Sequence, residues 1–304
     1  IVIGSVTLFL DQKMTISNAG TFPYTDADGT VWLAFSDWGE GKRDRILMSV
    51  HGLTRQSRDF DFLSSELKDQ YRVIEVDLAG HGKSGWLANK SGYCIENFLR
   101  HIDALLDYRG ISQMDWLGTA TGGLMGMLLA GRQDTSIRRL ILNDIGPSIS
   151  ASSIESFRRR FLEQPVFSNL SEAEKYFRTT YAEIGPIEDA QWSDYIIHSI
   201  NREPGPSYTL NYDPKVLDAF QPENLWDVYE HIQCPVLLLR GQNSSILDSE
   251  TAKAMTERGP GATLVEIGDC GHAPSLMTRD QVETIKSWLW ETEPQPENDE
   301  GHEN

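Results

Sequence analysis

The chain has 304 residues, of which 39% are hydrophobic, so it can form one large domain with an insertion, or at most two domains, around a sizeable core. Its 27 lysines and arginines stand against 45 aspartates and glutamates, which gives a net charge of −18. Nucleic acids and anionic membranes repel such a chain, so neither is expected as a partner. The expected partner is a small molecule. The chain could be a monomer or a homodimer.

The apolar opening, residues 1–10, is too short to span a bilayer and lacks a basic region. We therefore predict neither a transmembrane helix nor a signal peptide, and a cytoplasmic location. The three cysteines, Cys94, Cys234 and Cys270, lie far apart without C-x-x-C spacing, which argues against a disulfide framework and a structural zinc site. We expect no cofactor and no metal.

Short apolar segments alternate with amphipathic stretches along most of the chain, which is typical of a mainly parallel sheet covered by helices. The segments from residue 45 onward are rich in Val, Ile and Leu and bounded by turn residues, as buried parallel strands are. The predicted strands are Val31 to Asp37, Arg45 to Val50, Tyr71 to Val76, Met114 to Leu117, Arg139 to Asn143, Pro235 to Arg240 and Thr263 to Ile267.

Two loops follow the second and third of these strands. Residues 51–55, HGLTR, begin with a His-Gly pair, and His51 taken alone is better explained as a hydrogen-bonded loop residue than as a functional one. Residues 77–84, DLAGHGKS, contain glycines and a lysine but lack the G-x-x-x-x-G-K-[ST] spacing of a phosphate-binding loop. We interpret the second loop as structural.

A sharp turn follows the strand predicted at 114–117, and a helix of small residues follows the turn. The turn, residues 118–122, reads GTATG. In the pattern G-x-S-x-G the central residue lies in a strained turn, and the flanking glycines remove side chains that would collide there. Ala120 holds the place of the serine. A turn that only packs remains an alternative, whereas a dinucleotide-binding site does not fit, because G-x-G-x-x-G is absent.

A histidine and two carboxylates lie where strands are predicted to end. His272, in GDCGHAP at 268–274, follows the last strand and precedes the final helix, predicted over 279–290. Asp144 ends the strand at 139–143, and Asp248 follows the strand at 235–240. Asp248 also fits a helix N-cap, and Asp144 a turn carboxylate bonded to local N–H groups. We favour Asp144 as the partner of His272.

The four motifs at 51, 77, 118 and 268 resemble those of the α/β-hydrolase superfamily, especially small bacterial esterases and ring-cleavage-product hydrolases. The resemblance implies an α/β-hydrolase fold, with a mainly parallel sheet flanked by helices and a helical cap inserted between two strands. It also implies a mechanism: a serine at position 120 attacks an acyl carbon, His272 transfers the proton, and Asp144 holds the imidazole.

Other site residues follow from the same resemblance. The backbone N–H groups of Leu53 and Thr121 would form the oxyanion hole. Family members most often carry the acid after the strand that follows the cap, and there this chain has Ser244 and Ser245.

Ala120 has no nucleophilic oxygen, and its neighbours Thr119 and Thr121 point elsewhere at such a turn. Either the serine was deliberately changed to alanine, or the chain is a catalytically silent small-molecule binding protein. Retention of His272 and Asp144 favours the first. The predicted function is a serine hydrolase of a small carboxylic ester or lactone, present here in an inactive form. Cleavage of C–C or amide bonds in ring-cleavage products is the alternative.

The predicted organisation is a hydrolase core at 14–149 and 233–290 and a helical cap at 150–232. Residues 1–13 and 291–304 are predicted terminal extensions, and the tail, rich in Glu, Pro and Asn, is predicted to be disordered. Arg55 is the expected substrate contact. The cap arginines at 158–160 fit either a substrate-binding group or a solvated helix face.

Overall fold

The structure is a computed structural model that describes residues 18–39, 44–202, 205–219, 221 and 224–292. The predictions for residues 1–13 and for the tail from residue 293 lie outside the described residues. The last helix, α9 (Arg279–Glu291), ends one residue beyond its predicted end.

An eight-stranded sheet forms the centre of the molecule, in the order β1-β2-β4-β3-β5-β6-β9-β10. The first two strands are antiparallel to their neighbours, and the others are parallel, which confirms the predicted fold class. All seven predicted strands are present. The sheet comprises β1 (Asn18–Asp26), β2 (Gly29–Trp38), β3 (Ile46–Val50), β4 (Arg72–Val76), β5 (Met114–Thr119), β6 (Ile137–Asn143), β9 (Val236–Gly241) and β10 (Thr263–Ile267).

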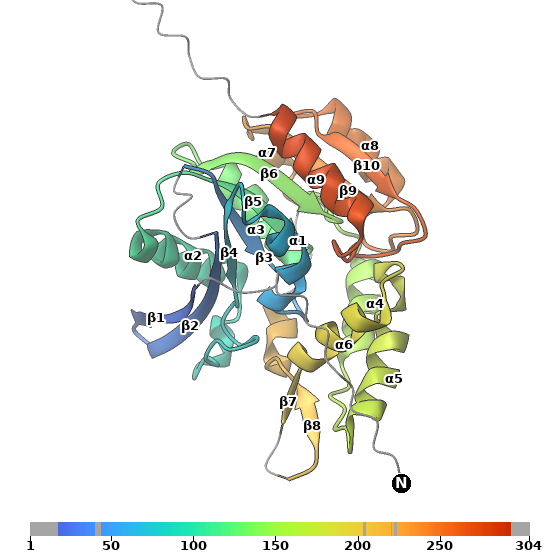
Figure 1. The fold of residues 1–304 in the computed structure, drawn as a ribbon. Coiled ribbons are helices and arrows are strands. Elements are labelled where there is room, and N and C mark those ends of the chain that lie inside the picture. The colour runs from blue at the N-terminus through green and yellow to red at the C-terminus, as the bar shows by residue number, and fades with distance from the viewer. Residues whose placement is uncertain (1–17, 40–43, 203–204, 220, 222–223, 293–304) are drawn as a thin grey trace, which may run out of the picture.

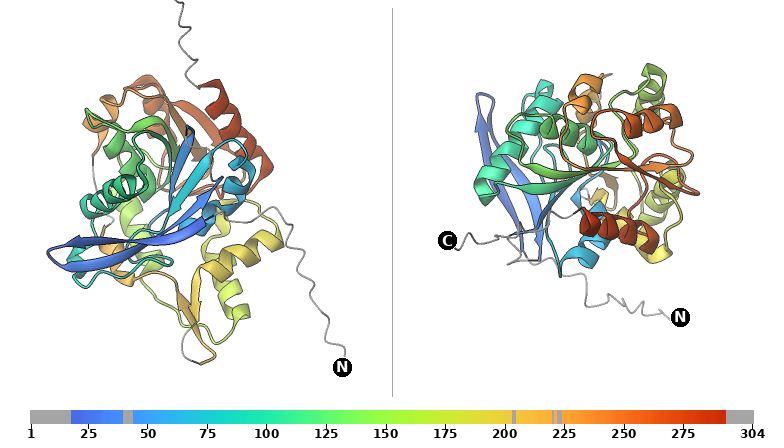
Figure 2. Two further views of the ribbon diagram at one scale, coloured as in Figure 1. Left: turned by 60° about the vertical axis from the view of Figure 1, so that its left-hand side comes forward. Right: turned by 90° about the horizontal axis from the view of Figure 1, so that it is seen from above.

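Helices cover both faces of this sheet, because successive strand residues point to opposite sides. In β6, for example, Leu140 and Leu142 join one apolar cluster while Ile141 joins the other. The helices α1 (Asp61–Leu67) and α9 pack on one face, and α2 (Ile95–Arg109), α3 (Thr121–Ala130) and α8 (Ser249–Glu257) belong to the cluster on the other (Figure 2).

The segment predicted as a helical cap contains α4 (Ala151–Phe161), α5 (Leu170–Thr180) and α6 (Asp189–His198). They lie together at one end of the sheet (Figure 1). The segment also holds a small antiparallel pair, β7 (Ile200–Arg202) and β8 (Tyr208–Leu210), which the sequence analysis did not predict. Its last helix, α7 (Trp226–Glu230), packs against α3 beside the main sheet.

The topology positions the site. β3 lies between β4 and β5, so the chain crosses from one side of β3 to the other between β4 and β5. In parallel sheets such a reversal leaves a crevice at the carboxyl ends of the strands, where ligands bind. The loop at 51–55 follows β3, and the turn at 118–122 begins at the end of β5, so both lie at this crevice.

A buried carboxylate lies in the layer between β4 and α1. One oxygen of Glu75 accepts a hydrogen bond from Ser64 Oγ at 2.5 Å, and the other has no partner among the described residues. Burial, followed by the neighbouring Asp61 carboxylate, raises the pKa of Glu75 well above its ordinary value. The folded state thus holds a proton that the unfolded state releases, and stability falls as pH rises from the unfolded pKa through the folded one.

Glu75→Gln is therefore expected to raise Tm at about pH 8 and to reduce the loss of Tm between about pH 5 and about pH 8, because the amide stays neutral. Each kcal/mol should appear as roughly 2–4 °C in thermal melts. Glu66→Gln, at an exposed position on α1, the helix that carries Ser64, is the control. A Glu75→Gln protein that loses as much Tm with rising pH as the parent would contradict this account.

Candidate active site

The turn at 118–122 has the strained geometry that the sequence pattern predicts. Ala120 connects β5 to α3 with φ 47° and ψ −111°, a conformation that residues with a side chain rarely adopt. A Cβ added to Gly118 would lie 2.2 Å from the carbonyl oxygen of Gly122, and one added to Gly122 would lie 2.1 Å from that of Val50. Both flanking positions therefore require glycine.

His272 and Asp144 form a hydrogen-bonded pair beside this turn. The distance from His272 Nδ1 to Asp144 Oδ2 is 2.7 Å, and the carboxylate is fully buried. Nδ1 must carry the proton, because the carboxylate can only accept, so Nε2 is left unprotonated in the neutral ring. His272 and Ala120 line the same pocket. The structure thus brings the three residues together.

Backbone strain is concentrated around this pair. Ala120, Asp144 and Ala273 are among the non-glycine residues with positive φ, at 47°, 59° and 63°. Such conformations cost on the order of 1–3 kcal/mol each and are concentrated at functional sites. Ala120 therefore has the strained backbone that the G-x-S-x-G pattern requires of its central residue, although its side chain is not a nucleophile.

Asp248 lies elsewhere. It is the N-cap of α8, where its Oδ1 accepts a hydrogen bond from Thr251 N at 2.7 Å and its Oδ2 one from Thr251 Oγ1 at 2.9 Å. Capping accounts for both oxygens of Asp248.

The loop after β3 lies directly against Ala120. A Cβ added to Gly52 would be 3.6 Å from the Cβ of Ala120, and Leu53 and Thr121 both line the pocket. Thr121 is the first residue of α3, so its N–H has no partner within the helix. His51 is structural: its Nε2 accepts a hydrogen bond from Leu78 N at 3.1 Å, and Nδ1 donates to Gly52 O at 2.8 Å.

The second loop, residues 77–84, is likewise structural. The Asp77 carboxylate accepts hydrogen bonds from the backbone N–H groups of Ser57 and Lys83, both at 2.8 Å. Gly82 has φ 53°, and a Cβ there would lie within 2.5 Å of the carboxylate.

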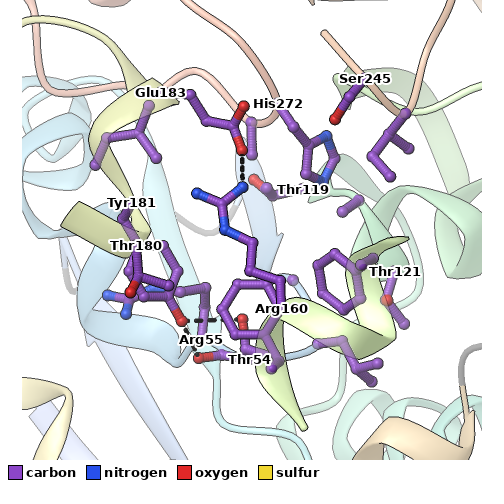
Figure 3. Close-up of a pocket in the computed structure, with 18 of the residues that line it drawn as sticks. Thr54, Arg55, Thr119, Thr121, Arg160, Thr180, Tyr181, Glu183, Ser245 and His272 are labelled. Carbon is purple, nitrogen blue, oxygen red and sulfur yellow. Dashed lines mark hydrogen bonds and ion pairs between the residues drawn. The ribbon is translucent and has the colours of Figure 1, made fainter. Parts of the chain in front are cut away.

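A pocket of about 110 Å³ opens over Ala120 and His272 (Figure 3). It is bounded by the loop after β3, the turn at 118–122, the His272 loop, and α4 and the segment after α5. This volume is below that of pockets for drug-sized ligands and suits a small acyl group. Hydroxyl groups are frequent in its lining: Thr54, Thr119, Thr121, Ser153, Ser156, Thr180, Tyr181, Tyr195, Ser245 and Ser275.

Arg55, the expected substrate contact, lines the pocket but is already paired. Its Nε and Nη2 donate to Asp59 at 2.7 and 2.6 Å, and its Cζ lies 3.5 Å from the ring centroid of Tyr195. Burial opposes its charge, but Asp59 outweighs this and places the pKa of Arg55 above its ordinary value. Arg55 is only 8% exposed, so it mainly carries a permanent positive charge in the pocket wall.

Of the three cap arginines, Arg160 lines the pocket. Its side chain reaches across the pocket to an ion pair with Glu183, beside His272 (Figure 3). It is 36% exposed, so a ligand can reach it far more easily than Arg55. Arg159 instead pairs with Glu155 on the exposed face of α4.

Two other side chains could be mistaken for replacement nucleophiles. Thr119 Oγ1 accepts a hydrogen bond from Asn143 Nδ2 at 3.1 Å and forms part of the pocket wall. Cys270, near Asp144, is buried; burial, followed by the Asp144 and Glu183 carboxylates, raises the pKa of its thiol to about 12. The thiol therefore stays protonated and unreactive.

Sequence reasoning missed Asn143, which donates to Thr119 Oγ1 and, at 2.9 Å, to Pro274 O. It ties the end of β5 to the His272 loop across β6. Its position directly before Asp144 could be seen in the sequence, but no pattern marks a residue that acts only through tertiary contacts.

Among the described residues, no group of three or more His, Cys, Asp or Glu is placed to hold a metal ion. No helix in the described part of the chain is long and apolar enough to cross a membrane.

Comparison with known proteins extends these observations. The model of the family described as alpha/beta hydrolase fold matches residues 45–276. A 3-hydroxybutyrate-oligomer hydrolase of Cupriavidus necator is 36% identical over 264 residues, which cover 82% of this chain and 90% of that protein. A pimeloyl-[acyl-carrier protein] methyl ester esterase of Nitrosomonas europaea is 27% identical, over 77% of this chain and 91% of the esterase. The crystal structure of an alpha/beta hydrolase from Novosphingobium aromaticivorans matches with a TM-score of 0.81 and 28% identity, and the match covers 91% of this chain and 99% of that chain.

Proposed function

Because the chain belongs to the alpha/beta hydrolase fold family, we propose that its site is that of a serine hydrolase that cleaves small carboxylic esters through an acyl-enzyme. The Ala120 chain is then the inactive serine-to-alanine form of this enzyme. The observation that carries the proposal is the Asp144–His272 pair, with the imidazole facing a pocket that also contains Ala120 in a nucleophile's strained conformation.

The proposed reaction divides the work among these residues. A serine oxygen at position 120 attacks the ester carbonyl while Nε2 of His272 takes its proton, and the imidazolium then protonates the leaving alkoxide. The Asp144 carboxylate holds the ring and stabilises the imidazolium. The N–H groups of Leu53 and Thr121 would stabilise the negative oxygen of the tetrahedral intermediate. Water, activated by His272, finally releases the acid.

For the substrate, we propose short hydroxy-acid esters that carry a free carboxylate, as in oligomers of 3-hydroxybutyrate. The small pocket, its many hydroxyl groups and the name of the Cupriavidus relative all support this class. The guanidinium of Arg160 can share its planar fork between Glu183 and a substrate carboxylate.

Lactone hydrolysis uses the same steps and stays within this proposal. Cleavage of C–C or amide bonds and a silent binding protein are the competing functions. An assay of the Ala120→Ser protein on a 3-hydroxybutyrate dimer, aryl esters, lactones, amides and vinylogous diketones separates them. Turnover of the esters supports the proposal. Turnover confined to the amides or diketones would show that the protein cleaves amide or C–C bonds. Binding without any turnover would show that it is a silent binding protein.

Arg160→Gln, in the Ala120→Ser background, is expected to raise KM for the 3-hydroxybutyrate dimer by about 10-fold, because a charge-assisted hydrogen bond to the carboxylate is lost. KM for the methyl ester of the same dimer should change little. Arg159→Gln, the neighbouring exposed arginine, is the matched control. Equal effects of Arg160→Gln on the free acid and the methyl ester would contradict a contact with the carboxylate.

A further inference from the structure

We propose that Ser244 is a positioning residue of this site: its hydroxyl donates a hydrogen bond to the Asp144 carboxylate and holds it against His272. The inference rests on the proposed roles of Asp144 and His272. It accounts for a partly buried hydrogen bond that joins the loop after β9 to Asp144, the residue directly after β6.

The Asp144 carboxylate is fixed by four hydrogen-bond donors. Its Oδ2 accepts from Ser244 Oγ at 2.6 Å, from His272 Nδ1 at 2.7 Å and from Ala273 N at 3.2 Å. Its Oδ1 accepts from Gly241 N at 2.8 Å. Ser244 is therefore the one side chain other than His272 that donates to this carboxylate among the described residues, and it binds the same oxygen as His272.

The loop around Ser244 fixes the direction of its hydrogen bond. Its Oγ accepts from the backbone N–H groups of Ile246 at 3.2 Å and Leu247 at 3.1 Å. A hydroxyl oxygen has two lone pairs and one proton. Since both lone pairs are used by the loop, the proton is left for Asp144. The hydroxyl is thus a pre-oriented donor and needs no reorganisation when the imidazole becomes charged.

Pre-orientation matters here because the backbone of Asp144 is strained, with φ 59°. Donors from two directions keep the side chain in the one arrangement in which Oδ2 faces Nδ1. The 2.6 Å contact also means that position 244 is itself a second place from which a carboxylate can reach His272, because an aspartate extends further than a serine. The acid should therefore be transferable between the two positions.

The first test uses the chain with Ala120 and needs no activity. The proton shared between His272 Nδ1 and Asp144 should give a downfield ¹H resonance, identified by its loss in His272→Ala. Ser244→Ala is expected to shift this resonance or broaden it, whereas Ser244→Thr, which keeps the hydroxyl, and Ser249→Ala, a nearby exposed position, should leave it in place. A resonance unaffected by Ser244→Ala would overturn the proposal.

The second test uses the Ala120→Ser background. Ser244→Ala is expected to lower kcat by about 10-fold with little change in KM, after correction for the folded fraction, because only the orientation of the acid is affected. Asp144→Asn should lower kcat by about 10⁴-fold. The double variant Asp144→Asn with Ser244→Asp should have a kcat at least about 10²-fold higher than Asp144→Asn alone.

The outcomes separate the two proposals. A lower Tm with an unchanged kcat per folded molecule would make Ser244 merely structural, and failure of the paired exchange to recover any rate or the downfield resonance would also overturn its assigned role. If the Ala120→Ser protein turns over no ester at all, the proposed function fails, while the resonance of the Ala120 chain still tests Ser244.

Discussion

Ala120→Ser is expected to raise the turnover of a 3-hydroxybutyrate dimer by a factor on the order of 10⁶, the scale on which loss of a catalytic serine acts in a serine protease. The reason is geometric. The backbone at position 120 already has φ 47° and ψ −111°, His272 is already paired with Asp144, and both flanking glycines are in place. The added serine oxygen therefore needs no rearrangement of the backbone or of the His272–Asp144 pair.

Initial rates of the parent and the variant, at equal folded fraction, measure this effect. The control is His272→Ala in the Ala120→Ser background, which should return the rate to near that of the parent, because the variant lacks the base that we propose takes the serine proton. Persistent activity without His272 would show that another group takes the proton.

The second large effect concerns the acid. In the Ala120→Ser background, Asp144→Asn is expected to lower kcat by about 10⁴-fold, because an asparagine amide can donate to Nδ1 and so favours the wrong imidazole tautomer. Asp248→Asn should change kcat little, since Asp248 caps α8 and asparagine is an equally good N-cap. Both variants should fold, which thermal melts can check.

The comparison of these two variants decides between Asp144 and Asp248 as the acid of the site. A larger loss in Asp248→Asn would move the acid to the loop after β9, against the observed hydrogen bonds. Equal small losses would mean that neither carboxylate orients the histidine.

Local patterns were sufficient to predict seven of the eight strands of the sheet and the turns at its carboxyl edge. The strands from β3 onward are apolar runs between turn residues, and Gly118 and Gly122 mark a turn that only glycine permits. β1 was not predicted because its sequence, NAGTFPYTD, contains Gly and Pro and buries little besides Phe22. The three-residue strands β7 and β8 are too short to show a period of their own.

The side-chain network of the site could be predicted only in part. His272 and Asp144 follow predicted strands, and that position suggested that they meet. Ser244 acts through Asp144, 100 residues away in the sequence, and Asn143 donates to Pro274 O, 131 residues away. Their roles depend on distances that no local pattern encodes. The contact of Arg55 with the Tyr195 ring and the ion pair of Arg160 with Glu183 depend in the same way on how the segment at 150–232 folds.

The proposed function requires a covalent acyl-enzyme at position 120. The most direct test is the intact mass of the Ala120→Ser protein, quenched in acid within milliseconds of mixing with an activated ester, followed by peptide mapping. We expect a mass increase equal to the acyl group, located on the peptide that contains position 120 and absent from the Ala120 parent. Two results would contradict the account. One is turnover without any covalent species in a variant whose deacylation is slowed, and the other is an acyl group on any other residue.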